Sequence, residues 1–466
     1  MRRAAVMASA GFPVGPPLSP EKADALLGAE TFLAAGCVDW DGRLRSKLVH
    51  RDKLESLCRE GVAMSTAIFA TDVTDTPMAN GLFQDPAHGY PDARLIFDAQ
   101  SLCKDVSRSG ETRVLLLGQL EAEYAAWCPR ALLGRELSRL HALGFMARGA
   151  GELECHVLAE TAETLQVKRP AALQSHPDFL RMYSHLDHLV AAPLLEQLQA
   201  RAAAMGLPVR TMHAEFRGLL EVCFEPEDPL AAASHWLCFK TMAKAVGREH
   251  GALLSFMARL SEVHETAGGH LNLSLLHVGD QSPAFGYDLD AAQPNEILRC
   301  FLGGLQQYLP DFFLVFAPNL NSWKRFAGPA FVPRTNSWGL DNKTAALRVV
   351  AATPGETRIE IRIGGADVNP CLVFAAALAA GRLGITERLL PRPAAGGDAA
   401  QPGLHCAAPF PSDFAQAIVR WRGSPQVRAV FGAEFVDAYA RSREWQLALF
   451  SQAVTDWEVR QFAEGV

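Results

Sequence analysis

Charged side chains alternate with isoleucines in residues 358–363, so that Arg358, Glu360 and Arg362 occupy every second position. This period of two predicts a strand with one charged face and one aliphatic face. Two guanidinium groups beside a carboxylate can hold anions and a cation on one surface. A solvated row of paired charges would give the same pattern. The Gly-Gly and Asn-Pro turns that follow, and the Ala-rich helix predicted over residues 371–383, favour a functional strand.

Three further segments carry polar side chains in a similar arrangement. They contain Glu152, Glu154 and His156; His270, Asn272 and Ser274; and Glu215 and Glu221, which flank a short irregular stretch. Strands with one polar and one apolar face predict a sheet that packs against helices on one side and lines a cavity on the other. Five carboxylates and one histidine would repel one another there unless cations lay among them. Oxygen ligands with a single imidazole favour Mg²⁺ or Mn²⁺ over zinc.

The composition bounds the class of protein. The chain has 466 residues, of which 49% are hydrophobic and 20% charged, as in an ordinary soluble globular protein. Its net charge of −7 argues against nucleic acid as a partner. No apolar run approaches the ~20 residues that span a bilayer, which argues against a membrane protein. The ten cysteines form no CxxC pair and predict reduced thiols in a cytoplasmic protein.

The chain divides into three predicted regions. Residues 1–20 are rich in Gly, Pro and Ala and are expected to be disordered. An amphipathic helix over 21–35, a hairpin over 38–45 and further short strands predict a small α+β domain over 21–120. Longer helices over 131–143, 185–205, 229–250 and 292–309 alternate with the polar-faced strands in a second domain, 121–466. That domain ends with an exposed connection over 391–411 and a helical region over 414–462.

Four motifs occur in a recognisable order. They are Asn321-Ser-Trp-Lys-Arg325, Trp338-Gly-Leu-Asp-Asn-Lys-Thr344, Arg358-Ile-Glu-Ile-Arg362 and Gly365-Ala-Asp-Val-Asn-Pro370. Together they resemble the glutamine synthetase superfamily, and in particular its γ-glutamylpolyamine (γ-glutamylputrescine) synthetase branch, over nearly the whole chain. The resemblance implies an N-terminal β-grasp domain and a catalytic domain with a curved antiparallel sheet flanked by helices. It also implies rings, a dodecamer of two hexamers, in which each N-terminal domain completes a neighbour's site.

The same resemblance implies roles for individual residues. Glu154, Glu215 and Glu221 resemble the ligands of one divalent ion, and Glu152, His270 and Glu360 those of a second. Arg325, Arg362 and Glu154 resemble the glutamate-binding residues. Arg348 and Arg358 resemble catalytic residues that contact the phosphates of ATP, and Asn272, Ser274 and Lys343 would line the nucleotide site. The implied reaction joins glutamate to an amine at the expense of ATP.

Several positions depart from the family pattern. The segment from Gly218 to Glu221 is apparently one residue short, Asn272 replaces a histidine, and Lys343 replaces an arginine. Phe331 and Val332 stand before Pro333 where ammonia-using members carry a glutamate that binds ammonium. The sequence therefore predicts an ATP- and Mg²⁺- or Mn²⁺-dependent ligase that joins glutamate, or a close analogue, to a primary amine or polyamine. An ammonia-using glutamine synthetase and a catalytically lapsed scaffold or regulatory homologue are the alternatives.

Overall fold

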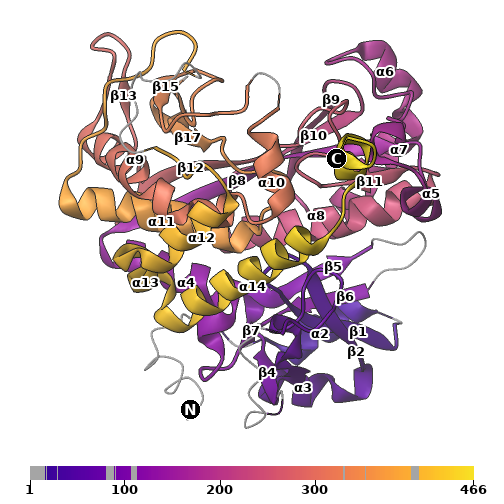
Figure 1. Cartoon of the computed structure of the whole chain (residues 1–466). Helices are drawn as coiled ribbons and strands as arrows, with labels where there is room; N and C mark the ends of the chain where they lie inside the picture. The colour runs from indigo at the N-terminus through magenta and orange to yellow at the C-terminus, as the bar shows by residue number, and fades with distance from the viewer. Residues whose placement is uncertain are drawn as a thin grey trace.

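The computed structural model describes residues 18–28, 30–79, 91–106, 113–328, 331–351, 353–399 and 409–465, together with residues 16 and 89. Most of the segment expected to be disordered lies outside this range, but at its end Leu18 is buried and Pro20 begins a helix. Figure 1 shows two parts, with the small sheets of the N-terminal part below one large sheet and its helices. The predicted α+β composition is confirmed by this arrangement.

The N-terminal part holds two small sheets. Its elements are α2 (Pro20–Leu27), β1 (Phe32–Val38), β2 (Leu44–His50), α3 (Leu54–Glu60), β3 (Val62–Ser65), β4 (Asp92–Ile96), β5 (Leu102–Asp105), β6 (Arg113–Leu117) and β7 (Gln119–Leu120). The first sheet has the order β2-β1-β6-β5, with β1 and β6 parallel, and the second has the order β3-β4-β7. The turn of the β1–β2 hairpin includes Asp41 and Gly42, as predicted.

The single helix predicted over residues 21–35 is wrong. Helix α2 ends at Leu27, and Gly28 follows with a φ of 56°, a conformation that favours glycine. The apolar run that follows forms β1, a central strand in which every residue after Phe32 is buried. A short buried strand and a buried helix segment have the same apolar pattern, so periodicity alone could not separate them.

The large sheet has eight strands. They are β8 (Phe145–Leu158), β9 (Val209–Ala214), β10 (Leu219–Phe224), β11 (Leu253–Ser255), β12 (Gly269–His277), β15 (Trp338–Leu340), β16 (Leu347–Val350) and β17 (Arg358–Ile361). Their order is β15-β16-β17-β12-β8-β10-β9, and β11 also pairs with β8. All pairs are antiparallel, as the resemblance implies, except β15 with β16 at one edge, which are parallel. The short β13 (Tyr287–Asp288) and β14 (Gln293–Pro294) pair separately.

Helices cover the apolar face of this sheet (Figure 1). They include α4 (Pro129–Ala142), α8 (Pro229–Glu249), α9 (Glu296–Phe316) and α11 (Pro370–Glu387). Ile359, Ile361 and Ile363 are fully buried, as the alternation predicts. Helix α11 packs closely on α9, where a Cβ added to Gly304 would lie 2.2 Å from the Ala380 carbonyl oxygen. The large core therefore lies between the sheet and these helices.

Smaller helices flank the sheet elsewhere. They are α5 (Ala162–Val167), α6 (His185–Val190), α7 (Ala192–Met205) and α10 (Leu320–Arg325). The helix predicted over 185–205 is divided into α6 and α7 at Ala191. Among the described helices, α11 alone has the length and composition to cross a membrane, and 72% of it is buried inside the protein, as expected of a core helix. The described cysteines are all free thiols.

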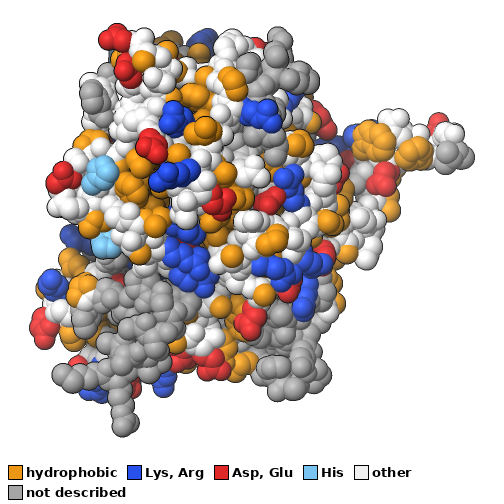
Figure 2. Space-filling model, turned by 90° about the vertical axis from the view of Figure 1, so that its left-hand side faces the viewer, with side chains coloured by type: hydrophobic (Ala, Val, Ile, Leu, Met, Phe, Trp, Pro, Cys, Tyr) orange, Lys and Arg blue, Asp and Glu red, His pale blue; other side chains and the backbone are white. Residues whose placement is uncertain are grey.

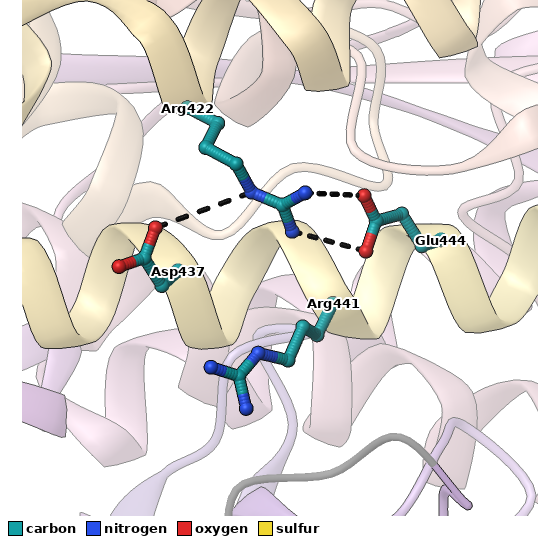
Figure 3. Close-up of a pocket in the computed structure, with 4 residues that line it drawn as sticks. All are labelled: Arg422, Asp437, Arg441 and Glu444. Carbon is teal, nitrogen blue, oxygen red and sulfur yellow. Dashed lines mark hydrogen bonds and ion pairs between the residues drawn. The ribbon is translucent and has the colours of Figure 1, made fainter.

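The helical C-terminal region is confirmed and consists of α12 (Phe414–Gly423), α13 (Pro425–Phe431), α14 (Ala433–Gln452) and α15 (Asp456–Phe462). In Figure 3, Arg422 of α12 forms a bidentate ion pair with Glu444 of α14, with nitrogen–oxygen distances of 2.6 and 3.0 Å. These two residues line a surface pocket together with Asp437 and Arg441. Charges that pair across two helices occupy this pocket, so we interpret it as structural. Arg443 of α14 also pairs with Asp41 of the N-terminal part over 2.7 Å.

The connection predicted to be exposed over 391–411 is partly packed. Its described beginning follows the β15 edge of the large sheet, where the Ala395 amide donates to the Trp338 carbonyl oxygen over 2.7 Å. Ala395 and Ala399 are buried, and the Ala399 carbonyl accepts a hydrogen bond from the Thr335 hydroxyl. Backbone pairing with an edge strand therefore holds this Pro- and Gly-rich segment, which composition alone could not indicate.

Candidate active site

A cavity of about 500 Å³ opens on the polar face of the large sheet. Its lining includes ten of the predicted site residues: Glu152, Glu154, Glu215, Glu221, His270, Arg325, Phe331, Lys343, Arg348 and Arg362. The other lining residues are Met182, Tyr183, Phe216, Leu219, Glu265, Thr266 and Val332. The fold thus collects, in one place, charged side chains from segments more than 200 residues apart.

Four predicted site residues do not line the cavity. Glu360 is buried, and its carboxylate accepts hydrogen bonds from Arg348 and Arg362. On the neighbouring strands, Arg358 Nε donates to Asn272 Oδ1 over 3.0 Å. Ser274 lies two positions beyond Asn272 on β12 and is half-buried like it. These residues extend the polar face of the sheet beyond the cavity.

Strand register determines which of these side chains meet. The pairs that lie directly opposite one another are His270 with Glu152, Glu221 with Glu154, Glu221 with His213, and Arg348 with Glu360. Opposed residues on one face of antiparallel strands have Cβ atoms about 5 Å apart. The acidic residues are therefore held together by the sheet backbone, and not by flexible loops alone.

The first compact group consists of Glu152, His270 and Glu360. His270 Nδ1 lies 3.0 Å from Glu152 Oε1 and 3.5 Å from Glu360 Oε1. His270 Nε2 is buried and has no hydrogen-bond partner among the described residues. One imidazole nitrogen thus faces two carboxylate oxygens, and the three ligand atoms lie within 4.8 Å of one another.

The second compact group consists of His213, Glu215 and Glu221. Glu215 follows β9 directly and Glu221 lies on β10, so the irregular stretch between them is the turn of a hairpin. The turn includes Arg217 and Gly218, both with positive φ. His213 was not predicted to be a site residue. Its position two residues before Glu215, on the same face of a strand, is the signal that could have found it.

Glu154 belongs to neither of these two groups. Its register partner is Glu221, and its Oε2 accepts a hydrogen bond from the Gly268 amide over 2.6 Å. Cys223 also faces this region, with its sulfur 3.4 Å from Glu221 Oε1. A thiol therefore lies among the carboxylates, which the oxygen-rich pattern of the sequence did not indicate.

Three arginines face the carboxylates. Arg348 Nη1 donates to Glu360 Oε2 over 2.8 Å, and Arg362 donates to Glu360 Oε1. Arg325, the last residue of α10, donates to the carbonyl oxygen of Ile363 over 3.1 Å, while its Nε has no partner. Burial lowers the pKa of Arg325 to about 10, although the charge of Glu154 opposes this shift. Arg325 thus has donor capacity left for an anionic ligand.

Two carboxyl groups in the cavity have opposite pKa shifts. Burial by itself would raise the pKa of Glu152, but the hydrogen bond and charge of His270, together with the charges of Arg362 and Arg348, lower it to about 2. Burial raises the pKa of Glu221 to about 9, and the charges of Glu152, Glu154 and Glu215 add to the effect. Glu221 therefore carries a proton at neutral pH unless a cation compensates its charge.

The donor set fits divalent cations. Each compact group offers two carboxylates and one imidazole, ligand types that Mg²⁺, Mn²⁺ and related ions accept. A cation near Glu221 would also relieve the repulsion that raises its pKa.

Apolar side chains form part of the cavity wall. Met182, Tyr183, Phe216 and Phe331 all line it, and each of these side chains is between 44 and 57% exposed. Phe331 has a φ of 71°, which is uncommon for a residue other than glycine. The wall therefore offers hydrophobic surface beside the acidic groups.

Comparison with known proteins agrees with this geometry. Residues 126–462 match the family model of the glutamine synthetase catalytic domain. A γ-glutamylethanolamide synthetase of Streptomyces coelicolor is 32% identical over 96% of both chains. A glutamate–isopropylamine ligase of a Pseudomonas species is 28% identical over 92% of this chain and 94% of that protein. A γ-glutamylputrescine synthetase of Escherichia coli is 27% identical over 90% and 89%.

A solved structure, ligand-free GmaS, has a TM-score of 0.79 at 22% identity, covering 93% of this chain and 97% of that one. This likeness confirms the mixed helix and sheet fold, and the β-grasp domain stays a prediction. The relatives confirm the prediction of an amide ligase of the glutamine synthetase type. The family model and the relative at 32% identity both cover most of the chain, and the protein therefore belongs to the glutamine synthetase family.

Proposed function

We propose that this protein is an ATP-dependent ligase that joins the γ-carboxylate of glutamate, or of a close analogue, to a primary amine or polyamine. The observation that carries the proposal is the cavity in which four of the predicted glutamates and His270 lie together with Arg325, Arg348 and Arg362. The ethanolamide, isopropylamine and putrescine ligases among the relatives support the same reaction class.

The reaction needs an activated carboxylate, because an amine does not displace oxide from a carboxylate at neutral pH. A γ-carboxylate oxygen attacks the γ-phosphorus of ATP, ADP leaves, and γ-glutamyl phosphate forms. The amine then attacks the acyl carbon and phosphate leaves, while one proton leaves the amine nitrogen. Divalent cations, when bound, would neutralise charge on the phosphates.

The chain's own residues have separable roles in this proposal. Glu152, His270 and Glu360 would hold one Mg²⁺ or Mn²⁺, and Glu215 and Glu221 with Glu154 the other. Arg325 and Arg362, with Glu154, would hold glutamate, since a guanidinium fork binds a carboxylate through two hydrogen bonds. Arg348 and Arg358 would stabilise the transferring phosphoryl group. Asn272, Ser274 and Lys343 would contact the nucleotide.

Phe331 supports an amine with a carbon chain, and not ammonia, as the substrate that attacks the acyl phosphate. Ammonium is strongly hydrated and needs anionic groups that desolvate and deprotonate it, whereas Phe331 offers no charge and no acceptor. Each buried CH₂ contributes about 0.8 kcal/mol, so an amine of three or four carbons gains about 2–3 kcal/mol over ammonia. That difference corresponds to a preference of about a hundredfold in kcat/KM.

ADP release in the presence of glutamate and a panel of amines, with ammonia included, tests the proposal. We expect the best primary amine to exceed ammonia by about a hundredfold in kcat/KM. Phe331→Glu should raise kcat/KM for ammonia and lower kcat/KM for the amine, whereas the control Phe331→Leu should keep the preference for the amine. Equal use of ammonia and amines by the wild type would indicate an ammonia-using glutamine synthetase. No ADP release with any amine or with ammonia would indicate a lapsed scaffold or regulatory homologue.

We also propose a cytoplasmic ring assembly, a dodecamer of two hexamers, in which the N-terminal region is a β-grasp domain at the subunit interface. Exposed apolar side chains support self-association. They include Val454, Trp457, Val459 and Phe462, in and next to α15. Figure 2 shows a part of the molecule that projects from the body and carries hydrophobic side chains. The face in Figure 2 also mixes acidic and basic side chains, which does not favour nucleic acid there. Light scattering should give about twelve times the chain mass of 50.5 kDa, and an active monomer would contradict the assembly.

A further inference from the structure

The two compact carboxylate–imidazole groups, each of which lines the cavity in part, have the same composition and nearly the same geometry. In the first, His270 Nδ1 lies 3.0 and 3.5 Å from oxygens of Glu152 and Glu360. In the second, His213 Nε2 lies 2.9 Å from Glu215 Oε1 and 3.5 Å from Glu221 Oε1. Adjacent ligands in an octahedral shell with bonds of about 2.1 Å lie about 3 Å apart. The nitrogen–oxygen separations in both groups are close to this value.

The fold holds His213 in place from two directions. Its strand register sets it directly opposite Glu221, on the polar face of the sheet. The ring of Tyr183 stacks on the His213 ring with centroids 4.6 Å apart and an interplanar angle of 24°. Tyr183 itself lines the cavity. His213 is therefore oriented with Nε2 toward the two carboxylates before any ligand arrives.

We propose that His213 is a nitrogen ligand of the cation held by Glu215 and Glu221, so that each of two cation positions has one imidazole ligand. This inference rests on the two-cation part of the proposed function and deepens it. An added imidazole increases affinity for transition-metal ions more than for Mg²⁺, which prefers oxygen ligands. The second position should therefore select Mn²⁺ over Mg²⁺, and His213 should determine that selectivity.

A role for His213 as only a hydrogen-bond donor to Glu215 makes a different prediction. In that case the ring would orient a carboxylate, and its loss would weaken Mn²⁺ and Mg²⁺ binding by the same factor. Direct coordination instead predicts a loss confined largely to Mn²⁺. The ratio of the two affinities separates the roles, and it is measured without ATP, glutamate or amine.

The experiment measures Mn²⁺ binding to the metal-free full chain from the EPR signal of free Mn²⁺, and Mg²⁺ binding by competition. We expect two Mn²⁺ per chain in the wild type, and at least tenfold weaker binding of one of them in His213→Gln, with Mg²⁺ affinity changed by less than about threefold. His277→Gln is the matched control, because His277 is at the end of β12 and belongs to neither compact group.

A second measurement needs no variant. Pulsed EPR of Mn²⁺ bound to wild-type protein with ¹⁵N-labelled histidine should show nitrogen couplings at both positions. Three results would each overturn the inference and leave the ligase proposal intact. They are unchanged Mn²⁺ binding in His213→Gln, a parallel loss of Mn²⁺ and Mg²⁺ affinity in that variant, and nitrogen coupling at only one of the two cation positions. Absence of Mn²⁺ binding to the wild type would overturn it together with the two-cation assignment. ADP release tests the ligase reaction separately.

Discussion

Replacing Glu221 with glutamine tests the crowding of carboxylates in the cavity. Burial, with the charges of Glu152, Glu154 and Glu215, raises the pKa of Glu221 from 4.5 to about 9. Between these values the unfolded chain has lost the proton that the folded, metal-free protein keeps. Folding therefore takes up a proton, and this contribution makes the metal-free protein less stable as pH rises toward 9. Glu221→Gln has no proton to take up and removes this dependence.

The magnitude follows from the shift. At pH 7.5 the solution lies about three pH units above the unfolded-state pKa of 4.5, and each unit corresponds to about 1.4 kcal/mol. Glu221→Gln should therefore raise the free energy of unfolding of the metal-free protein by at most about 4 kcal/mol at pH 7.5. The difference should fall to about 1 kcal/mol at pH 5.5.

Urea unfolding in the presence of EDTA, followed by tryptophan fluorescence from pH 5.5 to 8.5, measures this difference. Glu225→Gln is the matched control, because Glu225 directly follows β10 and its side chain is 52% exposed beside Arg210. Added Mn²⁺ should make the wild type more stable than Glu221→Gln, because the Glu221 carboxylate can bind the cation as a charged ligand and the glutamine amide cannot. A stability difference between Glu221→Gln and the wild type that stays constant across this pH range would refute the crowding argument.

Two further substitutions test the site and the core. Glu360→Ala should lower kcat for ADP release by at least a hundredfold, since it removes a proposed metal ligand and leaves Arg348 and Arg362 without their shared carboxylate. Near-wild-type turnover in a folded variant would remove Glu360 from the site. Glu356→Ala is the control, because Glu356 is exposed. Gly304→Ala should destabilise the protein by about 1–3 kcal/mol in thermal or urea unfolding, because its Cβ meets the Ala380 carbonyl oxygen of α11. Gly279→Ala, which meets nothing within 4 Å, should change stability little, and equal effects of the two would contradict the close-packing argument.

The local sequence pattern was sufficient to predict much of the structure of this protein. Alternation at a period of two placed Glu152, Glu154 and Glu360 on polar strand faces, and the motif order identified the family. The helices α4, α8, α9 and α11 were expected close to where they lie, and α11 was expected from its Ala-rich composition after an Asn-Pro turn. These features depend on neighbours in sequence, so the sequence determined them.

Other features depend on partners far away in the chain. Whether residues 32–38 form a helix or a strand was decided by pairing with β2 and β6. The role inferred for His213 depends on the register that sets it opposite Glu221 and on Tyr183, thirty residues before it, which stacks on its ring. The pKa of Glu221 is high because the fold buries this side chain and places three other glutamates, two of them from a different strand, around it. Charge repulsion and ligand geometry act through space, so only the tertiary structure could decide them.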